Sequence, residues 1–254
     1  MKLIVLGSGT SVPHPRRASP SFWLETAGGT ILLDAGADAL HRMAEERLDW
    51  PGLDVIWISH FHLDHIAGLF PLLFGMKWAP QLQDREKTLR IVGDPGLGEL
   101  IASINRAGNY RLLDQHFPIE IVEVKAGETF DILPEVAART FSTPHTQESM
   151  ALRLLERNEK SFVYTSDTGF SEDLITFASG VDLLLLECSF RRNKPVQTHL
   201  ELSDAMQVAI KCAPGKLILT HLYPEWDGID LVSEAQTLWS GEILEATDGL
   251  RVVI

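Results

Sequence analysis

Four side chains able to bind a metal ion stand within six positions of the chain: His60, His62, Asp64 and His65. They follow residues 55–58, a short apolar run of β-branched and aromatic residues that predicts a buried strand. In extended backbone, side chains two positions apart point to the same side, so His60 and His62 can bind one metal ion. Asp64 and His65 can then turn toward a second position beside it. Imidazole and carboxylate ligands favour Zn²⁺, with Mn²⁺ or Fe²⁺ as alternatives.

These four residues could instead be unrelated polar side chains in a loop. Three of the nine histidines of the chain lie within six positions, however, together with an aspartate. This clustering favours a metal site at the end of a strand, where side chains from neighbouring segments can converge on a cleft.

The H-x-H-x-D-H pattern of residues 60–65 resembles the signature of the metallo-β-lactamase superfamily. The resemblance implies an α/β fold, a four-layer αβ/βα sandwich in which two mixed β-sheets lie face to face with helices outside. It also implies that further ligands come from distant loops. The residues expected there are His145, Asp167 and His221, each at the end of an apolar run.

The implied ligand set fills two metal positions and a bridge between them. It comprises His60, His62 and His145 on one ion, Asp64, His65 and His221 on the other, and Asp167 between the two. Two zinc ions would lower the pKa of a bridging water from about 15.7 toward about 7, which would make a hydroxide nucleophile. Asp64, beside that water, would bind metal and accept a proton. All seven positions carry competent ligands, whereas a binding or scaffold protein on an inactive hydrolase fold would usually have lost some.

Three further acidic or basic residues have roles by resemblance. Asp34, after the apolar run 30–33, would orient metal ligands without binding metal itself, with a plain turn or cap aspartate as the alternative. The segments 187–190 and 198–200 resemble the ribonuclease Z branch of the superfamily. The resemblance implies that Glu187 orients His199. His199 would then act on the leaving oxygen as a general acid, or as a charge partner for the developing phosphorane. The alternative for His199 is an exposed loop histidine that caps the following helix.

Residues 68–72, 187–189 and 199–202 look similar to the short phosphonate-pathway phosphodiesterases that hydrolyse a cyclic ribosyl phosphate, the family that the chain resembles in outline. It departs from them by lacking an N-terminal cysteine cluster. It departs from the ribonuclease Z branch at Glu201, where that branch often has Thr or Ser.

The composition is that of an ordinary globular protein with an acidic charge balance. Of 254 residues, 45% are hydrophobic and 22% charged, and the formal net charge is −13. Non-specific nucleic-acid binders gain affinity by neutralising phosphates, so this charge disfavours nucleic acid as the main partner without excluding a local basic patch. No apolar run reaches 18 residues and no signal-like segment opens the chain. We therefore expect a cytoplasmic protein without a membrane partner, in which Cys188 and Cys212 are buried thiols.

Short apolar runs bounded by Gly and Pro predict many strands with a few helices between them. Strands are expected at residues 2–6, 21–25, 30–34, 55–58, 90–93, 118–124, 129–133, 136–141, 150–155, 161–165, 181–187, 216–221, 242–246 and 250–254. Helices are expected at residues 37–48, 96–107, 174–178, 203–212 and 231–238, and one may start near residue 65. No repeat or linker appears, so we expect a single hydrolase domain over residues 1–254.

The loop after the first strand contains glycines at positions 7 and 9 but does not fit a dinucleotide-binding motif. Val12 stands where G-x-G-x-x-G requires its third glycine, and no helix is predicted to follow. We interpret the loop as structural. His14, Arg16 and Arg17 within it could reach a phosphate, although solvated side chains are the favoured interpretation.

The function favoured by the sequence is a metal-dependent hydrolase, a dizinc phosphodiesterase that cleaves a small or cyclic phosphodiester with a metal-bridging hydroxide. The alternatives are an RNA 3′-processing endonuclease of the ribonuclease Z type, and an ester, thioester or lactam hydrolase at the same metal site. Only 21 residues separate His145 from Asp167, where ribonuclease Z inserts a long arm that holds tRNA. The expected partner is therefore a small-molecule phosphodiester, with nucleic acid not favoured. A homodimer is implied by the resemblance alone.

Overall fold

A computed structural model describes residues 1–157 and 159–254 of the chain and places their strands in two seven-stranded sheets. The first sheet has the order β14-β1-β2-β3-β4-β5-β6. Its strands are β1 (Lys2–Gly7), β2 (Ser21–Thr26), β3 (Gly29–Leu33), β4 (Val55–Trp57), β5 (Leu89–Gly93), β6 (Ile119–Glu123) and β14 (Arg251–Val253). Pairing is antiparallel from β14 to β3 and parallel from β3 to β6.

The second sheet repeats this arrangement with the order β13-β12-β11-β10-β9-β8-β7. Its strands are β7 (Thr129–Leu133), β8 (Val136–Ser142), β9 (Met150–Glu156), β10 (Ser161–Tyr164), β11 (Leu183–Glu187), β12 (Lys216–Thr220) and β13 (Ile243–Glu245). Pairing is antiparallel from β7 to β10 and parallel from β10 to β13. Each sheet is therefore mixed, as the four-layer prediction requires.

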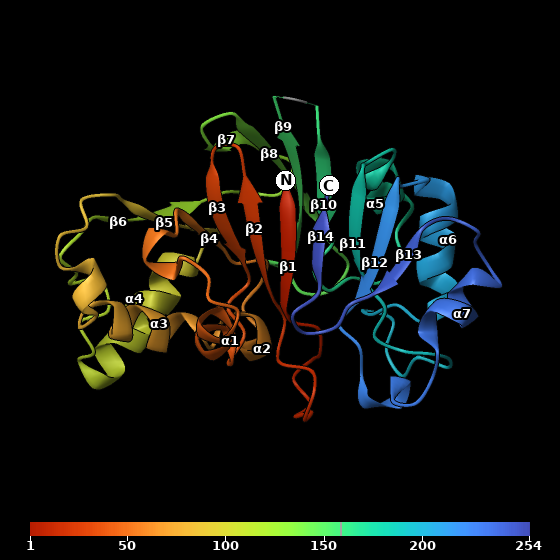
Figure 1. Ribbon diagram of the computed structural model, residues 1–254, viewed down its shortest axis with the longest axis horizontal. Coiled ribbons are helices and arrows are strands. Elements are labelled where there is room, and N and C mark those ends of the chain that lie inside the picture. Colours follow the sequence, from red (N-terminus) through yellow and green to blue (C-terminus); the bar gives the residue numbers. More distant parts are fainter. Residues whose placement is uncertain (158) are drawn as a thin grey trace.

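Helices lie on the outer faces of the two sheets, and the two termini lie close together between them (Figure 1). On the first sheet these are α1 (Ala39–Glu45), α2 (Leu63–Ile66), α3 (Leu69–Met76) and α4 (Leu97–Gly108). On the second they are α5 (Glu172–Ala178), α6 (Leu202–Cys212) and α7 (Leu231–Gln236). In the described part of the chain, short 3₁₀ turns occur at Trp50–Gly52, Pro80–Leu82 and Pro224–Trp226. No helix in the described ranges is long and apolar enough to span a membrane.

Three hydrophobic clusters correspond to the three interfaces between the four layers. The central cluster joins the inner faces of the sheets, with Phe22 and Trp57 from the first and Phe162 and Leu185 from the second. A second cluster packs α5, α6 and α7 on the outer face of the second sheet, and a third packs α1, α3 and α4 on the first. Strands near the middle of each sheet are buried on both faces, which explains their unbroken apolar sequences. The predicted sandwich is confirmed.

Most predicted elements lie within one or two residues of their observed bounds, with two exceptions. The helix start expected near residue 65 corresponds to two short helices, α2 and α3, whose bounds were not predicted. The helix predicted at residues 37–48 is shorter, at Ala39–Glu45. It ends early because the chain enters a left-handed conformation at Arg47, with φ of 55°.

The loop after β1 also differs from the sequence-based interpretation. His14 pairs with Asp227 at 2.7 Å, and Arg17 pairs with Glu245 at 2.8 Å with its side chain only 10% exposed. These two side chains therefore fix the loop to the protein, and only Arg16 is mainly solvated. Cys188 and Cys212 are buried free thiols, as predicted.

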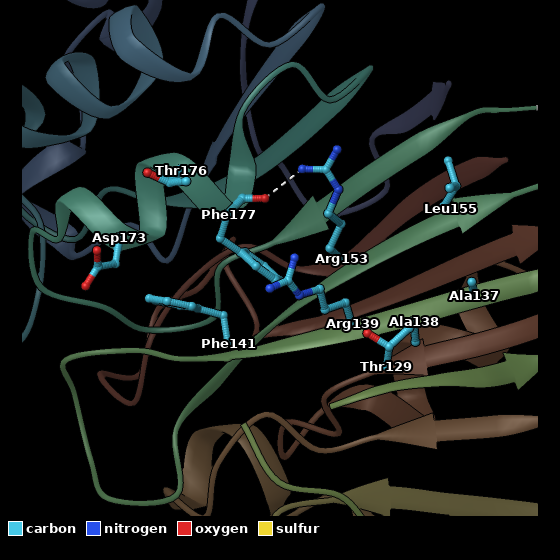
Figure 2. A pocket seen from close by; sticks show the side chains of 10 residues that line it. All are labelled: Thr129, Ala137, Ala138, Arg139, Phe141, Arg153, Leu155, Asp173, Thr176 and Phe177. Atoms are coloured by element: carbon cyan, nitrogen blue, oxygen red, sulfur yellow. Dashed lines mark hydrogen bonds between the residues drawn. The ribbon is translucent and has the colours of Figure 1, made fainter. Parts of the chain in front are cut away.

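A part of the second sheet's outer face borders a cavity. This cavity lies beside α5 and is lined by outward-facing residues of β8 and β9 (Figure 2).

Candidate metal centre

The candidate metal centre lies where parallel strands of both sheets end. Asp34 follows β3, the segment from His60 to His65 follows β4, and Asp167 follows β10. Glu187 ends β11 and His221 follows β12. Because parallel strands deliver their carboxyl ends to the same edge of a sheet, residues distant in sequence meet at this edge.

Three residues at these strand ends have left-handed backbone conformations. The φ angles of Asp34, Ser166 and His221 are 56°, 56° and 59°. A residue with a β-carbon pays about 1–3 kcal/mol for such a conformation, so it persists only where surrounding contacts enforce it. Here the turn after each strand directs a polar side chain into the same small volume. Strained residues of this kind are typical of functional sites.

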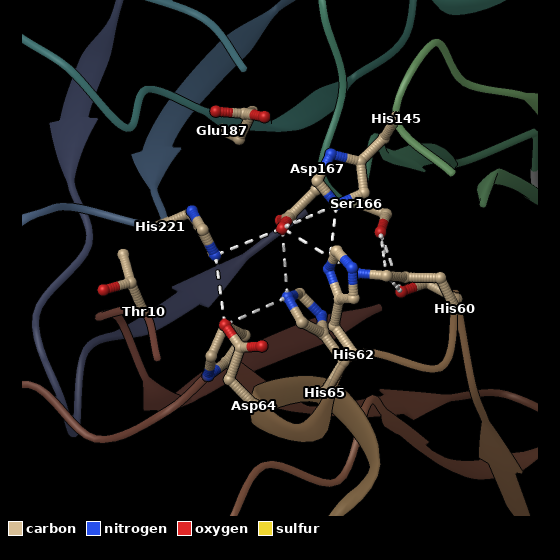
Figure 3. A network of polar contacts seen from close by, with 12 residues as sticks. Thr10, His60, His62, Asp64, His65, His145, Ser166, Asp167, Glu187 and His221 are labelled. Carbon is tan, nitrogen blue, oxygen red and sulfur yellow. Dashed lines mark hydrogen bonds and ion pairs between the residues drawn. The ribbon is translucent and has the colours of Figure 1, made fainter. Parts of the chain in front are cut away.

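Asp167 lies at the centre of the cluster (Figure 3). Its Oδ2 atom is 3.3 Å from Nε2 of both His65 and His221, 3.6 Å from Nε2 of His145 and 3.8 Å from Nε2 of His60. These separations are longer than hydrogen bonds to an imidazole but suit atoms that bind a common ion at about 2.0–2.2 Å. Asp167 therefore stands where a carboxylate could bridge two ions.

The donor atoms form groups that match the two predicted metal positions. Ligand atoms within 4.8 Å of one another belong to His60, His62, His145 and Asp167 in one group, and to Asp64, His65 and His221 in another. Asp64 Oδ2 lies 3.7 Å from His65 Nε2 and 3.6 Å from His221 Nε2. The structure thus brings together all seven residues that the sequence singled out as ligands.

Three buried nitrogen atoms support occupation of this site by a metal. The Nε2 atoms of His60, His65 and His221 are buried without a hydrogen-bond partner in the described part of the chain. A buried polar atom without a partner costs about 1–3 kcal/mol, so such atoms are rare. All three face the Asp167 carboxylate. Their residues fit the metal, because imidazole nitrogens and carboxylate oxygens are its usual ligands.

The protonation states of the free site also suit metal binding. Burial opposes ionisation of Asp167, but the charges of His221 and His65 outweigh it and hold the pKa of this carboxyl well below its usual range. Burial and the neighbouring His65 lower the pKa of His60, which keeps its imidazole neutral. Burial also opposes protonation of His65, yet Asp167 and Asp34 raise its pKa well above the usual value. Metal binding must therefore release a proton from His65.

Asp34 fixes the orientation of a ligand, as predicted for a residue that does not itself bind metal. Its fully buried carboxylate lies 2.7 Å from His65 Nδ1, so Nε2 of that ring faces the cluster. The same carboxylate accepts hydrogen bonds from Ser59 N, from Ser59 Oγ and from the Tyr164 hydroxyl, at 2.7–2.8 Å. Three of these four partners are at Oδ2 and one is at Oδ1, so the carboxylate is used in holding His65 and its surroundings.

Three further ligand histidines are held through their Nδ1 atoms by groups whose role the sequence analysis missed, whereas His62 Nδ1 lies 3.0 Å from His145 Nε2. His60 Nδ1 contacts Ser59 Oγ at 3.0 Å and Ser166 Oγ at 3.3 Å, and the two hydroxyls bond to each other. His221 Nδ1 contacts Ser189 Oγ at 2.9 Å. His145 Nδ1 lies 3.0 Å from the Thr198 carbonyl oxygen. The roles of these serines and of Tyr164 had no sequence signal, because isolated hydroxyl residues are common after strands. Two of the contacts, Tyr164–Asp34 and Ser166–Ser59, also join residues more than 100 positions apart.

Glu187 and His199 form a pair at the edge of the cluster, as predicted. His199 Nδ1 is 2.9 Å from Glu187 Oε1, and the glutamate is buried. Burial opposes protonation of His199, but the hydrogen bond and charge of Glu187 raise its pKa above the usual value. The His199 ring stacks on His221 with centroids 5.4 Å apart, and its ligand atom lies within 4.8 Å of those of Asp167 and His221. His199 can therefore reach a substrate bound at the metals.

Comparison with known proteins identifies the family. The family model of the beta-lactamase superfamily domain matches residues 29–222. The chain belongs to the metallo-β-lactamase superfamily. A ribonuclease Z of Mycobacterium sp. (strain KMS) is 30% identical over 244 residues, which cover 88% of this chain and 85% of that protein.

Two solved structures of the superfamily have the same fold over nearly the whole chain. The metallo-β-lactamase fold protein YhfI of Bacillus subtilis has a TM-score of 0.85 at 25% identity, covering 99% of this chain and 98% of its own. A diphosphatase from the PhnP family has a TM-score of 0.75 at 21% identity, covering 100% and 97%. With these relatives and its complete ligand cluster, this superfamily member is a metal-dependent hydrolase, an enzyme that acts on ester bonds.

Proposed function

We propose that the protein is a phosphodiesterase that hydrolyses a small or cyclic phosphodiester and binds two zinc ions. The observation that carries this proposal is the Glu187–His199 pair beside the metal ligands. An ester or lactam hydrolase would leave this pair without a role, because the metals alone could supply its chemistry. A phosphodiester has a charged transition state and an oxygen leaving group, and both can use a positioned imidazolium.

In this proposal one residue, Asp64, acts on the attacking water and another, His199, acts on the leaving group. Bound divalent ions supply positive charge for the phosphoryl oxygens and lower the pKa of water. The Asp64 carboxylate, at the edge of the cluster, accepts the proton of the attacking water. His199 donates a proton to the leaving oxygen through Nε2, since Nδ1 is held by Glu187. Glu187 keeps the ring in this orientation and favours its protonated form.

Two features support a small substrate. The 21 residues between the proposed ligands His145 and Asp167 mainly form strands β9 and β10. This segment is therefore too short to contain an additional arm as well. The net charge of −13 opposes association with a polyanion. The similarity in fold to a PhnP-family diphosphatase is compatible with a small phosphate ester, although at 21% identity it bears on the fold alone.

A second candidate is an RNA 3′-processing endonuclease. It is favoured by one observation, the 30% identity to a mycobacterial ribonuclease Z. Binding of tRNA in a mobility-shift assay at physiological salt would support this candidate.

The test is hydrolysis of bis(p-nitrophenyl) phosphate by protein loaded with Zn²⁺ or Mn²⁺, measured beside nitrocefin and a thioester. We expect chelator-sensitive turnover of the phosphodiester only. On a phosphodiester with an alkoxide leaving group, such as a nucleoside 2′,3′-cyclic phosphate, the leaving oxygen needs a proton, which p-nitrophenolate does not. On that substrate His199→Ala should lower kcat by about 10²–10⁴-fold while the zinc content per chain stays unchanged. His41→Ala, which removes an exposed imidazole on α1, serves as the matched control and should retain full activity.

Turnover only of the thioester or the lactam would contradict the proposal, even if the metal content is as expected. Full phosphodiesterase activity of His199→Ala would remove the observation on which the proposal rests.

A further inference from the structure

Two arginines face each other on the outer surface of the second sheet. Arg139 of β8 and Arg153 of β9 are direct cross-strand partners. Their sequence neighbours Ala138, Leu152 and Leu154 are buried between the sheets or layers, so both arginines point outward. Like charges directly opposite each other destabilise a sheet. An anion bound between the two guanidinium groups would remove this repulsion. The chain has an excess of acidic residues, with a net charge of −13, so a carboxylate partner for the pair would be expected.

No carboxylate of the described chain neutralises this pair. Arg153 Nη1 donates to the backbone oxygens of Phe177 at 2.6 Å and Ser179 at 3.2 Å, which fixes its guanidinium. The Arg139 side chain has neither an ion-pair nor a hydrogen-bond partner among the described residues, although its backbone pairs within the sheet. Asp173 lies on the same cavity but forms no ion pair with either arginine there. Burial and the charge of Arg139 together lower the pKa of Arg153.

The arginines line a cavity of about 510 Å³ that also has an aromatic wall (Figure 2). Phe141 of β8 and Phe177 of α5 stack with centroids 5.2 Å apart and an interplanar angle of 28°. Small side chains such as Ala137 leave the space open. A cavity of several hundred Å³ with an apolar wall and a few fixed polar groups is typical of a small-molecule site.

This cavity is separate from the metal centre. None of the residues that line it is a member of the metal cluster or of the Glu187–His199 pair. Its lining combines the two arginines with aromatic and alkyl side chains, two threonines and the single carboxylate of Asp173, a set that we interpret as a binding site.

We propose that the cavity binds an anion carried on a flat ring, of the nucleoside monophosphate class. The planar guanidinium groups of Arg139 and Arg153 would pair with the phosphate oxygens, as arginine does at phosphate sites. The ring would lie against Phe141 and Phe177, where aromatic stacking adds affinity. The bound phosphate would also relieve the repulsion between the two arginines.

The test is calorimetric titration of the metal-loaded, full-length protein with adenosine 5′-monophosphate at low salt. Arg139→Gln should weaken binding about tenfold or more, because a charged hydrogen-bonded pair is lost. This variant removes an exposed side chain and a repulsion, so it should fold as well as the original protein. Arg139→Gln combined with Arg153→Gln should abolish binding. Arg157→Gln is the matched control, because this exposed arginine pairs with Glu135 outside the cavity, and it should bind normally.

Three results would overturn the proposal. The first is equal affinity in Arg139→Gln and Arg157→Gln. The second is loss of binding when the metals are chelated, which would place the nucleotide at the metal centre. The third is equally tight binding of inorganic phosphate, or much tighter binding of a single-stranded oligoribonucleotide, since either would exclude a small aromatic phosphate as the ligand.

Discussion

At the scale of single residues, the metal site depends on side chains that do not bind metal. Asp34 is the clearest case, because its carboxylate holds His65 and is itself held by Ser59 and Tyr164. Asp34→Asn would replace one acceptor oxygen by an NH₂ group, which donates and cannot accept, so the network that fixes His65 would lose at least one bond. We expect metal affinity to fall about 10–100-fold, which competition with a chromogenic chelator measures.

The control for this change lies four residues away. Asp38 is exposed at the start of α1 and makes no side-chain cap, so Asp38→Asn should leave metal affinity unchanged. Equal zinc affinity in both variants would show that Asp34 has no part in ligand orientation.

A second residue-scale prediction concerns Asp94, directly after β5. Burial, with Glu148 and Glu123 nearby, raises the pKa of Asp94 from 3.8 to about 6. A carboxyl whose folded pKa is raised opposes folding once it ionises, so the penalty is absent below about pH 4 and complete above about pH 6. Asp94→Asn should therefore stabilise the protein at about pH 8 by about 1 kcal/mol, a value discounted for solvent screening.

Urea unfolding at about pH 4 and about pH 8 tests this sign. The gain of Asp94→Asn should vanish at the lower pH, and exposed Asp84→Asn should show no gain at either. A variant that is stabilised equally at both pH values would rule out ionisation of Asp94 as the cause.

At the scale of elements, Glu201 explains a departure from the ribonuclease Z pattern. It occupies the N-cap of α6 and forms a capping box with Asp204, whose Oδ2 accepts from Glu201 N at 3.5 Å. The Glu201 carboxylate also accepts from Lys194 N at 3.0 Å and Ser203 Oγ at 2.9 Å. Glu201→Ala should lower the free energy of unfolding by about 1 kcal/mol, whereas Glu201→Thr should cost less because threonine also caps helices. Urea unfolding measures both, and equal losses would contradict the capping role.

The strands were predictable from the sequence for a physical reason. Runs such as Leu183–Glu187 are buried on both faces, so their apolar character is continuous and Gly or Pro bounds it. The end of helix α1 was harder to predict. The turn after it has the same mixture of polar and apolar residues as the helix, and the change of backbone direction comes only at the left-handed Arg47. The backbone of a non-glycine residue in that conformation leaves no mark in sequence.

The candidate site was predictable only in part. Its ligands stand in a dense pattern or directly after apolar strands, so local sequence and family resemblance find them. Tyr164, Ser166 and Ser189 orient the ligands, directly or through Asp34, only because the fold brings them together. Ser59 precedes His60 in the sequence, but its bond to Asp34 spans 25 positions. Hydroxyl contacts of this kind have no characteristic spacing, which is why these roles were missed.

At the scale of the whole molecule, the metal cluster connects the two sheets. His60 and His65 come from the first sheet, and Asp167 and His221 from the second, so bound ions would join halves that otherwise meet through the central hydrophobic cluster. Without metal, buried Nε2 atoms lack partners at this same boundary. Metal binding and folding stability should therefore be coupled.

Chelation should consequently lower the unfolding temperature of the whole protein. At a metal concentration about 1,000 times the Kd, binding contributes about 4 kcal/mol, or about 10 °C for a chain of this size. The difference between metal-loaded and chelated protein should shrink below about pH 6, because protonated histidines release metal. Differential scanning fluorimetry with and without chelator measures both effects, and readded Zn²⁺ should restore the higher temperature. Asp167→Asn, which lacks the proposed bridging carboxylate, should respond much less to chelator. An unfolding temperature that stays constant in the original protein while its zinc content falls to zero would refute this coupling between the sheets.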